Sequence, residues 1–278
     1  MPKVYPRGHP LRSAYLKLKR AQVHINSLEG RARRFRTLYP DPNAGYETHS
    51  DPDAHAFYVQ GSRPIPDDWG PAVGDILTNL RAALDHLTWV LAWQNLGEEL
   101  YRLPDGEQRR IAFPFTDSES AFEGTTTYRH IIPGARNPME SLQPYHAADW
   151  PGLYVLTLLN DFTNMDKHRV VTPVLRQGAI RLGPDSGARI ALDFHEQDYT
   201  LIFTAKTAAR ISDQFDPSYS VDIVFEESPI AAGDFPSDMP GLLHPGLPIG
   251  VFAFIHEFIR DEVFPLFDGF LSEPPRVE

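Results

Sequence analysis

The sequence predicts an α+β protein in which a helical bundle is flanked by an antiparallel β-sheet. Apolar residues recur at three- and four-residue steps, the period of an amphipathic helix, in four segments: 11–37, 69–96, 149–169 and 251–267. Between 177 and 227 apolar and polar residues alternate instead, which is typical of strands. With 278 residues, 42% of them hydrophobic, the chain is long enough to bury a sizeable core.

The segment 69–96 is the longest uninterrupted helical pattern in the chain. Asp68 is expected to cap its first turn, and Gly97 is expected to end it. One broad apolar stripe is expected to face partner helices, and it consists of Val73, Ile76, Leu77, Leu80, Leu84, Leu87 and Leu91.

The four helices and the strands divide the chain into three predicted regions. Residues 1–175 form a helical core that contains an irregular connector at 98–148, where IAFPF and LQPY are short apolar islands. Residues 176–227 form an antiparallel β-meander. Residues 228–278 begin with a long loop rich in Pro and Gly and end with a helix that packs back on the core.

Charge is distributed unevenly along the chain. The net charge is −11, yet residues 1–40 carry ten Lys or Arg and one Glu, which leaves −20 on the remainder. The basic helix expected at 11–37 can therefore bind the phosphates of RNA or an acidic patch of its own protein.

Composition and missing motifs exclude several classes of protein. The absence of Cys rules out disulfides, zinc-thiolate sites and cysteine nucleophiles. Neither of the phosphate-binding motifs G-x-x-x-x-G-K and G-x-G-x-x-G occurs, nor does the G-x-S-x-G motif of serine hydrolases, and no cofactor is expected. The sequence contains no run of 18 apolar residues and no secretory signal, so the prediction is a cytoplasmic protein without membrane contact.

Polar residues form a lengthwise row on the helix expected at 69–96. Asp75, Asn79 and His86 lie on one line that borders the apolar stripe. Arg81 lies roughly 140° around the axis from His86, and Asp85 is placed four residues later to pair with Arg81.

The helix expected at 149–169 carries a second row of the same kind. Asn160, Asn164 and His168 follow one another at four-residue steps. If the two helices pack together, His86 and His168 face a common groove that the other polar residues of both rows fill. Unpaired buried polar groups cost about 1–3 kcal/mol each, so the rows are expected to satisfy one another.

Arg81 and His86 have the spacing R-x-x-x-x-H, which resembles the motif of HEPN ribonucleases. In that family, Arg and His meet across the cleft of a dimer and cut RNA without metal. The resemblance implies a homodimer in which His86 takes the 2′-hydroxyl proton and Arg81 steadies the scissile phosphate.

A second resemblance covers more of the chain. The motifs GD-x3-NLR-x2-LDH and DKHR, with FPF and LQPY between them, resemble a family of uncharacterised bacterial proteins. The resemblance implies a signature that consists of Asp75, Asn79, Arg81, Asp85, His86, Asn160, Asp166, Lys167, His168 and Arg169.

These observations define the candidate site. Candidate catalytic residues are Arg81, His86 and His168, and candidate binding residues are Asp75, Asn79, Asp85, Asn160, Asn164, Asp166, Lys167 and Arg169. The same residues can instead form a structural hydrogen-bonded seam, and the chain can be a non-catalytic module that binds a ligand or a protein.

A further alternative is a metal site built from Asp75, His86, Asp161 and His168. The pairs His195-Glu196 and His256-Glu257 lack the second His of a zinc-protease helix and are expected at the surface.

Overall fold

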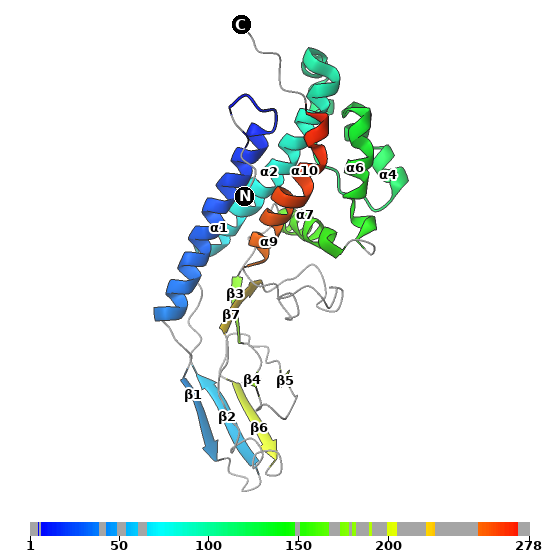
Figure 1. Cartoon of the computed structure of the whole chain (residues 1–278). Coiled ribbons are helices and arrows are strands. Elements are labelled where there is room, and N and C mark those ends of the chain that lie inside the picture. The colour runs from blue at the N-terminus through cyan, green and yellow to red at the C-terminus, as the bar shows by residue number, and fades with distance from the viewer. Residues whose placement is uncertain are drawn as a thin grey trace.

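The computed structural model describes residue 5, residues 7–38, 66–147, 151–166 and 250–271, together with the backbone of several short strands. Most of this part of the chain is helical. Figure 1 shows the long helices side by side in one helical body. They are α1 (Arg12–Leu38), α2 (Trp69–Leu96), α7 (Tyr154–Asp166) and α9 (Val251–Phe258).

Helix α2 lies at the centre of the body and begins and ends near the expected residues. Gly97 ends it with a positive φ of 53°, and its N–H bonds to the Trp93 carbonyl oxygen. Asp68, however, does not cap the first turn with its side chain. Its carboxylate accepts a hydrogen bond from Nη1 of Arg31 on α1 (2.8 Å), so the expected cap is instead an ion pair between helices.

The C-terminal helix is continuous but changes its winding. After α9 comes one π-helical turn, η5 (Ile259–Val263), followed by α10 (Phe264–Phe267) and a 3-10 turn, η6 (Asp268–Phe270). Pro265 stands just after the π turn, where its missing N–H removes one helical hydrogen bond.

Short helices fill the segment between α2 and α7. Ile132 donates its backbone N–H to the Leu91 carbonyl oxygen of α2 (3.2 Å), and Asn95 of α2 donates to the His130 carbonyl oxygen (3.0 Å). These bonds hold the segment against the central helix. Its elements are η1 (Gly97–Arg102), α3 (Asp105–Gln108), α4 (Glu119–Glu123), α5 (Thr126–His130), η2 (Pro133–Ala135), α6 (Arg136–Ser141) and η3 (Pro144–His146); η4 (Pro151–Leu153) then precedes α7.

The strands are short and belong to three separate small sheets. One has the order β1-β2-β6, one pairs β3 with β7, and one pairs β4 with β5; all pairings are antiparallel. The strands are β1 (Asn43–Thr48), β2 (Ala54–Gln60), β3 (Pro173–Gln177), β4 (Ile180–Arg181), β5 (Arg189–Ile190), β6 (Tyr199–Thr204) and β7 (Val221–Phe225).

The predicted α+β class, with one sheet flanking the bundle, is therefore wrong. The protein is mostly helical, and the part of the chain whose side chains the structure describes contains no strand. In Figure 1 the short strands lie beyond one end of the helical body and do not cover a face of it. Alternation predicts extended backbone but does not specify which strands pair, and β6 pairs with β2, more than 130 residues earlier.

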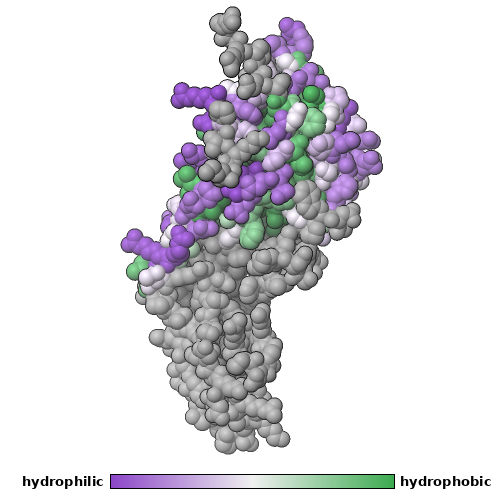
Figure 2. All heavy atoms as spheres, in the orientation of Figure 1, coloured by the Kyte–Doolittle hydropathy of each residue, from purple (hydrophilic) through white to green (hydrophobic). Residues whose placement is uncertain are grey.

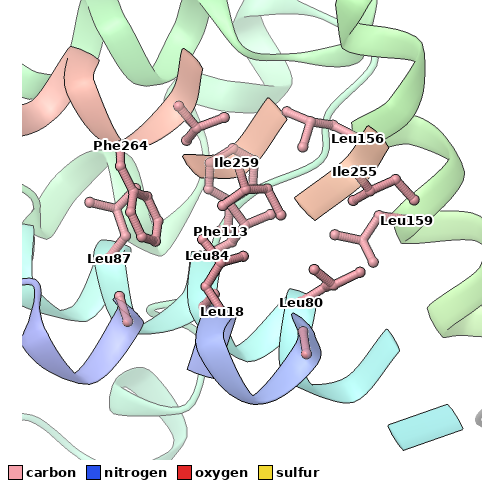
Figure 3. Packing of buried hydrophobic residues seen from close by; sticks show 14 of the residues in the cluster. Leu18, Leu80, Leu84, Leu87, Phe113, Leu156, Leu159, Ile255, Ile259 and Phe264 are labelled. Carbon is pink, nitrogen blue, oxygen red and sulfur yellow. The ribbon is translucent and has the colours of Figure 1, made fainter. Parts of the chain in front are cut away.

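One hydrophobic core joins the long helices. The seven residues of the predicted stripe on α2 are all fully buried. Figure 3 shows how side chains from α1, α2, α7, the segment 111–115 and the C-terminal helix converge, with labels on Leu18, Leu80, Leu84, Leu87, Phe113, Leu156, Leu159, Ile255, Ile259 and Phe264. Segments far apart in sequence thus contribute to the same core.

Candidate functional site

Arg81 is the centre of the best-connected polar cluster among the candidate residues. Its Nη2 donates to the Phe113 carbonyl oxygen (2.9 Å), its Nη1 to Oδ1 of Asn160 (3.2 Å), and its Nε to Oδ1 of Asp85 (3.3 Å). The guanidinium also lies over the Phe115 ring, 4.5 Å from its centroid. Arg81 therefore ties α2 to α7 and to the segment 111–115, and we name these five residues the Arg81 clasp.

The clasp also satisfies the backbone of the extended segment 111–115. The Phe113 N–H donates to Oδ1 of Asp85 (2.9 Å), while the Phe113 carbonyl oxygen accepts from Arg81. Two side chains one helical turn apart on α2 thus bond both backbone polar groups of Phe113, whose side chain is buried in the core. The predicted Arg81–Asp85 pair is confirmed.

Burial changes the electrostatics of the clasp. It lowers the pKa of Arg81, and the carboxylate of Asp85 offsets part of that effect. The guanidinium stays charged because its ordinary pKa is so high. Sequence reasoning did not assign Phe113 and Phe115 to the site, although the isolated FPF island was a usable signal.

His86 lies on the other flank of α2, next to α1. Its pKa is lowered by burial first and then by the nearby charge of Lys17, with Asp85 acting in the opposite direction. His86 makes no hydrogen bond within the described part of the chain. Arg81 contacts α7 and Phe113, so the two residues of the R-x-x-x-x-H spacing have different neighbours.

The rest of the first polar row also lies beside α1. Oδ2 of Asp75 lies 4.0 Å from Nδ1 of His24 on α1, and most of the Asp75 side chain is exposed. Asn79 donates to the Asp75 carbonyl oxygen in its own helix (2.8 Å). The row formed by Asp75, Asn79 and His86 therefore borders the seam between α1 and α2.

Helix α7, which carries the second row, meets α2 at two places, and only Asn160 of the described residues of that row takes part. Asn160 belongs to the clasp, and the Asp166 carboxylate lies against Gly74, where an added Cβ would be 2.9 Å from Oδ2. Burial, followed by the charge of Asp75, raises the pKa of Asp166, and burial also raises that of Asp161. Asn164 is exposed.

Of the four residues of the DKHR motif, the structure describes only Asp166. Lys167, His168 and Arg169 lie outside the described residues, so the meeting of His86 with His168 stays a prediction. Within the described ranges, no group of three or more His, Asp or Glu could hold a metal ion.

His256 contradicts the surface position expected for the His256-Glu257 pair. Its side chain is only 5% exposed, and its ring hydrogen-bonds to the backbone of Leu18 on α1, while Nδ1 has no hydrogen-bond partner among the described residues. Burial, followed by the charge of Arg260, lowers its pKa to about 4. The imidazole is therefore neutral at pH 7 and joins α9 to α1.

This burial predicts a pH-dependent stability. The pKa of His256 is about 4 in the folded chain against an ordinary 6.5, so below pH 6.5 the unfolded chain binds a proton that the folded chain does not. Its contribution to stability is complete above pH 6.5 and is lost as the pH falls towards 4. Between pH 7 and pH 5 we expect a loss of roughly 2 kcal/mol in denaturant unfolding.

The control for this prediction is His256→Leu, which keeps an apolar side chain at the buried position and removes the titrating group. Its free energy of unfolding should change less between pH 7 and pH 5 than that of the wild-type protein. Equal pH dependence of the two proteins would show that His256 is not the responsible group.

Two further polar clusters hold the short helices together. Glu140 accepts hydrogen bonds from Tyr145 and His146, each at 2.6 Å, and Glu107 pairs with His130 at 2.8 Å. Burial alone would raise the pKa of Glu140, but the two hydrogen bonds lower it overall. Sequence reasoning missed both clusters because their spacings do not follow a helical period.

The exposed side of α1 is a basic surface. Lys19, Arg20, Arg33 and Arg34 are exposed and make no ion pair within the described ranges, whereas Arg31 is held by Asp68. We name these four residues the α1 cationic face. Figure 2 shows hydrophilic side chains along the edge of the molecule where α1 runs.

Comparison with family models, with curated proteins and with solved structures finds no match to this chain. Among the described helices, none is long and apolar enough to cross a membrane.

Proposed function

We propose that this chain is a non-catalytic binding module that holds an anionic macromolecule against the α1 cationic face. The observation that carries the proposal is the charge on that face. Its four cations fall within an arc of about 140° on a helical wheel. Glu29, the one acidic residue of α1, is half-buried outside this arc. A surface of one charge sign attracts partners of the opposite sign.

The distances along α1 suit an extended partner. Lys19 and Arg20 form one pair and Arg33 and Arg34 form another. The second pair is offset from the first by fourteen positions, which corresponds to about 21 Å along the axis. A partner must present negative charge over that length. RNA, the partner expected from the basic segment, and an acidic protein both have this property.

Binding is favoured over RNA cleavage because Arg81 is already engaged. To steady a scissile phosphate, its guanidinium would have to leave the Phe113 carbonyl oxygen, Asn160 and Asp85. That exchange would take this donor away from the Phe113 carbonyl oxygen and from Oδ1 of Asn160, which costs about 1–3 kcal/mol for each group left unsatisfied.

Heparin chromatography tests the proposed function. The wild-type protein should be retained on a heparin column despite its net charge of −11. A variant with all four cations of the face replaced by Gln, the α1 charge variant, should elute at clearly lower salt. The reason is that each lost cation removes one salt-dependent ionic contact.

The matched control removes the same number of charges elsewhere. It carries Gln at four exposed positions outside α1: Arg7, Arg102, Arg109 and Arg110. The control should elute close to the wild-type protein. Equal elution of the control and the α1 charge variant would mean that net charge alone governs retention, and the proposal would fail.

A further inference from the structure

Two large apolar side chains lie on the same side of α1 as the α1 cationic face. Leu16 is 46% exposed and Val23 is 51% exposed, and they lie seven residues apart. Gly30 follows after another seven residues, and a Cβ added there would meet nothing within 4 Å. We name Leu16, Val23 and Gly30 the α1 stripe.

Resting on the proposed function, we propose that the α1 stripe is the docking seam for an acidic amphipathic helix of a partner protein. Apolar residues seven positions apart lie on one side of a helix, where a single partner helix can contact both. Leu16 and Val23 supply two apolar knobs. Gly30, with open space above it, lets a large partner side chain approach the backbone of α1 closely.

Charge identifies the partner as acidic and not as a second copy of the chain. The stripe runs between Lys19 and Arg20 near one end and Arg33 and Arg34 near the other. A symmetric pairing of α1 with itself would place cations opposite cations, which is destabilising. A helix with Glu or Asp beside its apolar positions would instead pair with all four cations.

The apolar residues favour a protein over RNA. Phosphate contacts would use the cations and leave Leu16 and Val23 in water. A partner helix buries both, so it uses the apolar and the charged parts of the face together.

Fluorescence anisotropy with two synthetic peptides tests the docking seam on the full-length protein. One is a labelled 21-residue peptide with Leu at the a and d positions of three heptads and Glu at most others. The second has the same composition in scrambled order. The ordered peptide should bind at least about tenfold more tightly, a difference that two buried apolar anchors can produce.

Variants of the stripe separate its contribution from that of the charges. Leu16→Ser combined with Val23→Ser, and separately Gly30→Trp, should each weaken binding of the ordered peptide about tenfold. Neither should alter elution from heparin. Gly106→Trp is the control, because a Cβ at Gly106 also meets nothing within 4 Å. Circular dichroism establishes that each variant is folded.

The outcomes distinguish this inference from the proposed function. Equal binding of the ordered and scrambled peptides, or no loss in the Leu16 and Val23 variant, would overturn the docking seam and leave the proposed function standing. Tighter binding of a single-stranded RNA than of the ordered peptide would also overturn it. If the α1 charge variant bound both peptides and heparin like the wild-type protein, the proposed function itself would fail.

Discussion

Deleting residues 250–271 together with all that follows should leave a chain that cannot fold. The C-terminal helix contributes fully buried side chains to the core, namely Phe252, Ile255, Ile259, Val263, Phe264 and Phe267. Burying one such side chain is worth about 1.5–3 kcal/mol, so the six together contribute roughly 9–18 kcal/mol, as much as the 5–15 kcal/mol that stabilises a typical domain. Thermal denaturation should show no cooperative transition.

Single substitutions in the same helix provide the control. Phe252 is fully buried, whereas nearly half of the Phe254 side chain is exposed. Phe252→Ala should cost about 3–5 kcal/mol of unfolding free energy, and Phe254→Ala should cost well below about 1 kcal/mol. A truncated chain that still melted cooperatively would mean that the C-terminal helix is an appendage to the core.

Replacing Arg81 with Met should destabilise the fold by about 2–3 kcal/mol. The substitution keeps an apolar side chain over Phe115 but removes the donors to the Phe113 carbonyl oxygen, Asn160 and Asp85. The side chains of Arg81 and Asp85 are partly exposed, so water limits the cost. Denaturant unfolding at pH 7 measures the change.

Arg81→Lys and His86→Gln are the comparisons. A lysine cannot reproduce the fork that reaches three acceptors, so it should recover only part of the loss. His86 makes no hydrogen bond within the described residues, and its replacement should change stability by less than about 1 kcal/mol. An Arg81→Met protein as stable as the wild type would contradict the structural role of the clasp.

The sequence predicted the helices well because their apolar period is a property of the local chain. The stripe from Val73 to Leu91 is buried as expected, and Arg81 pairs with Asp85 four residues away. Both results depend only on the geometry of one helix. His256 could have been assigned to the core in the same way, since it lies four residues after Phe252 and one turn before Ile259.

The parts that failed depend on contacts between distant segments. Helical spacing placed Asp75 and His86 on one line, but it could not show that the line borders α1. Asn160 of α7 accepts a hydrogen bond from Arg81, and so does the backbone carbonyl oxygen of Phe113. Phe113 belongs to a segment whose apolar residues follow neither a helical nor a strand period. The α+β prediction failed for the same reason, because strand pairing is a long-range property.

Denaturing electrophoresis of end-labelled single-stranded RNA, incubated with the purified protein, tests most directly the proposal that the chain does not cut RNA. If the chain is a non-catalytic binding module, the RNA stays intact with the wild-type protein, with His86→Gln and with the α1 charge variant alike, in the presence or absence of magnesium. Cleavage by the wild-type protein that is abolished in His86→Gln would contradict this proposal.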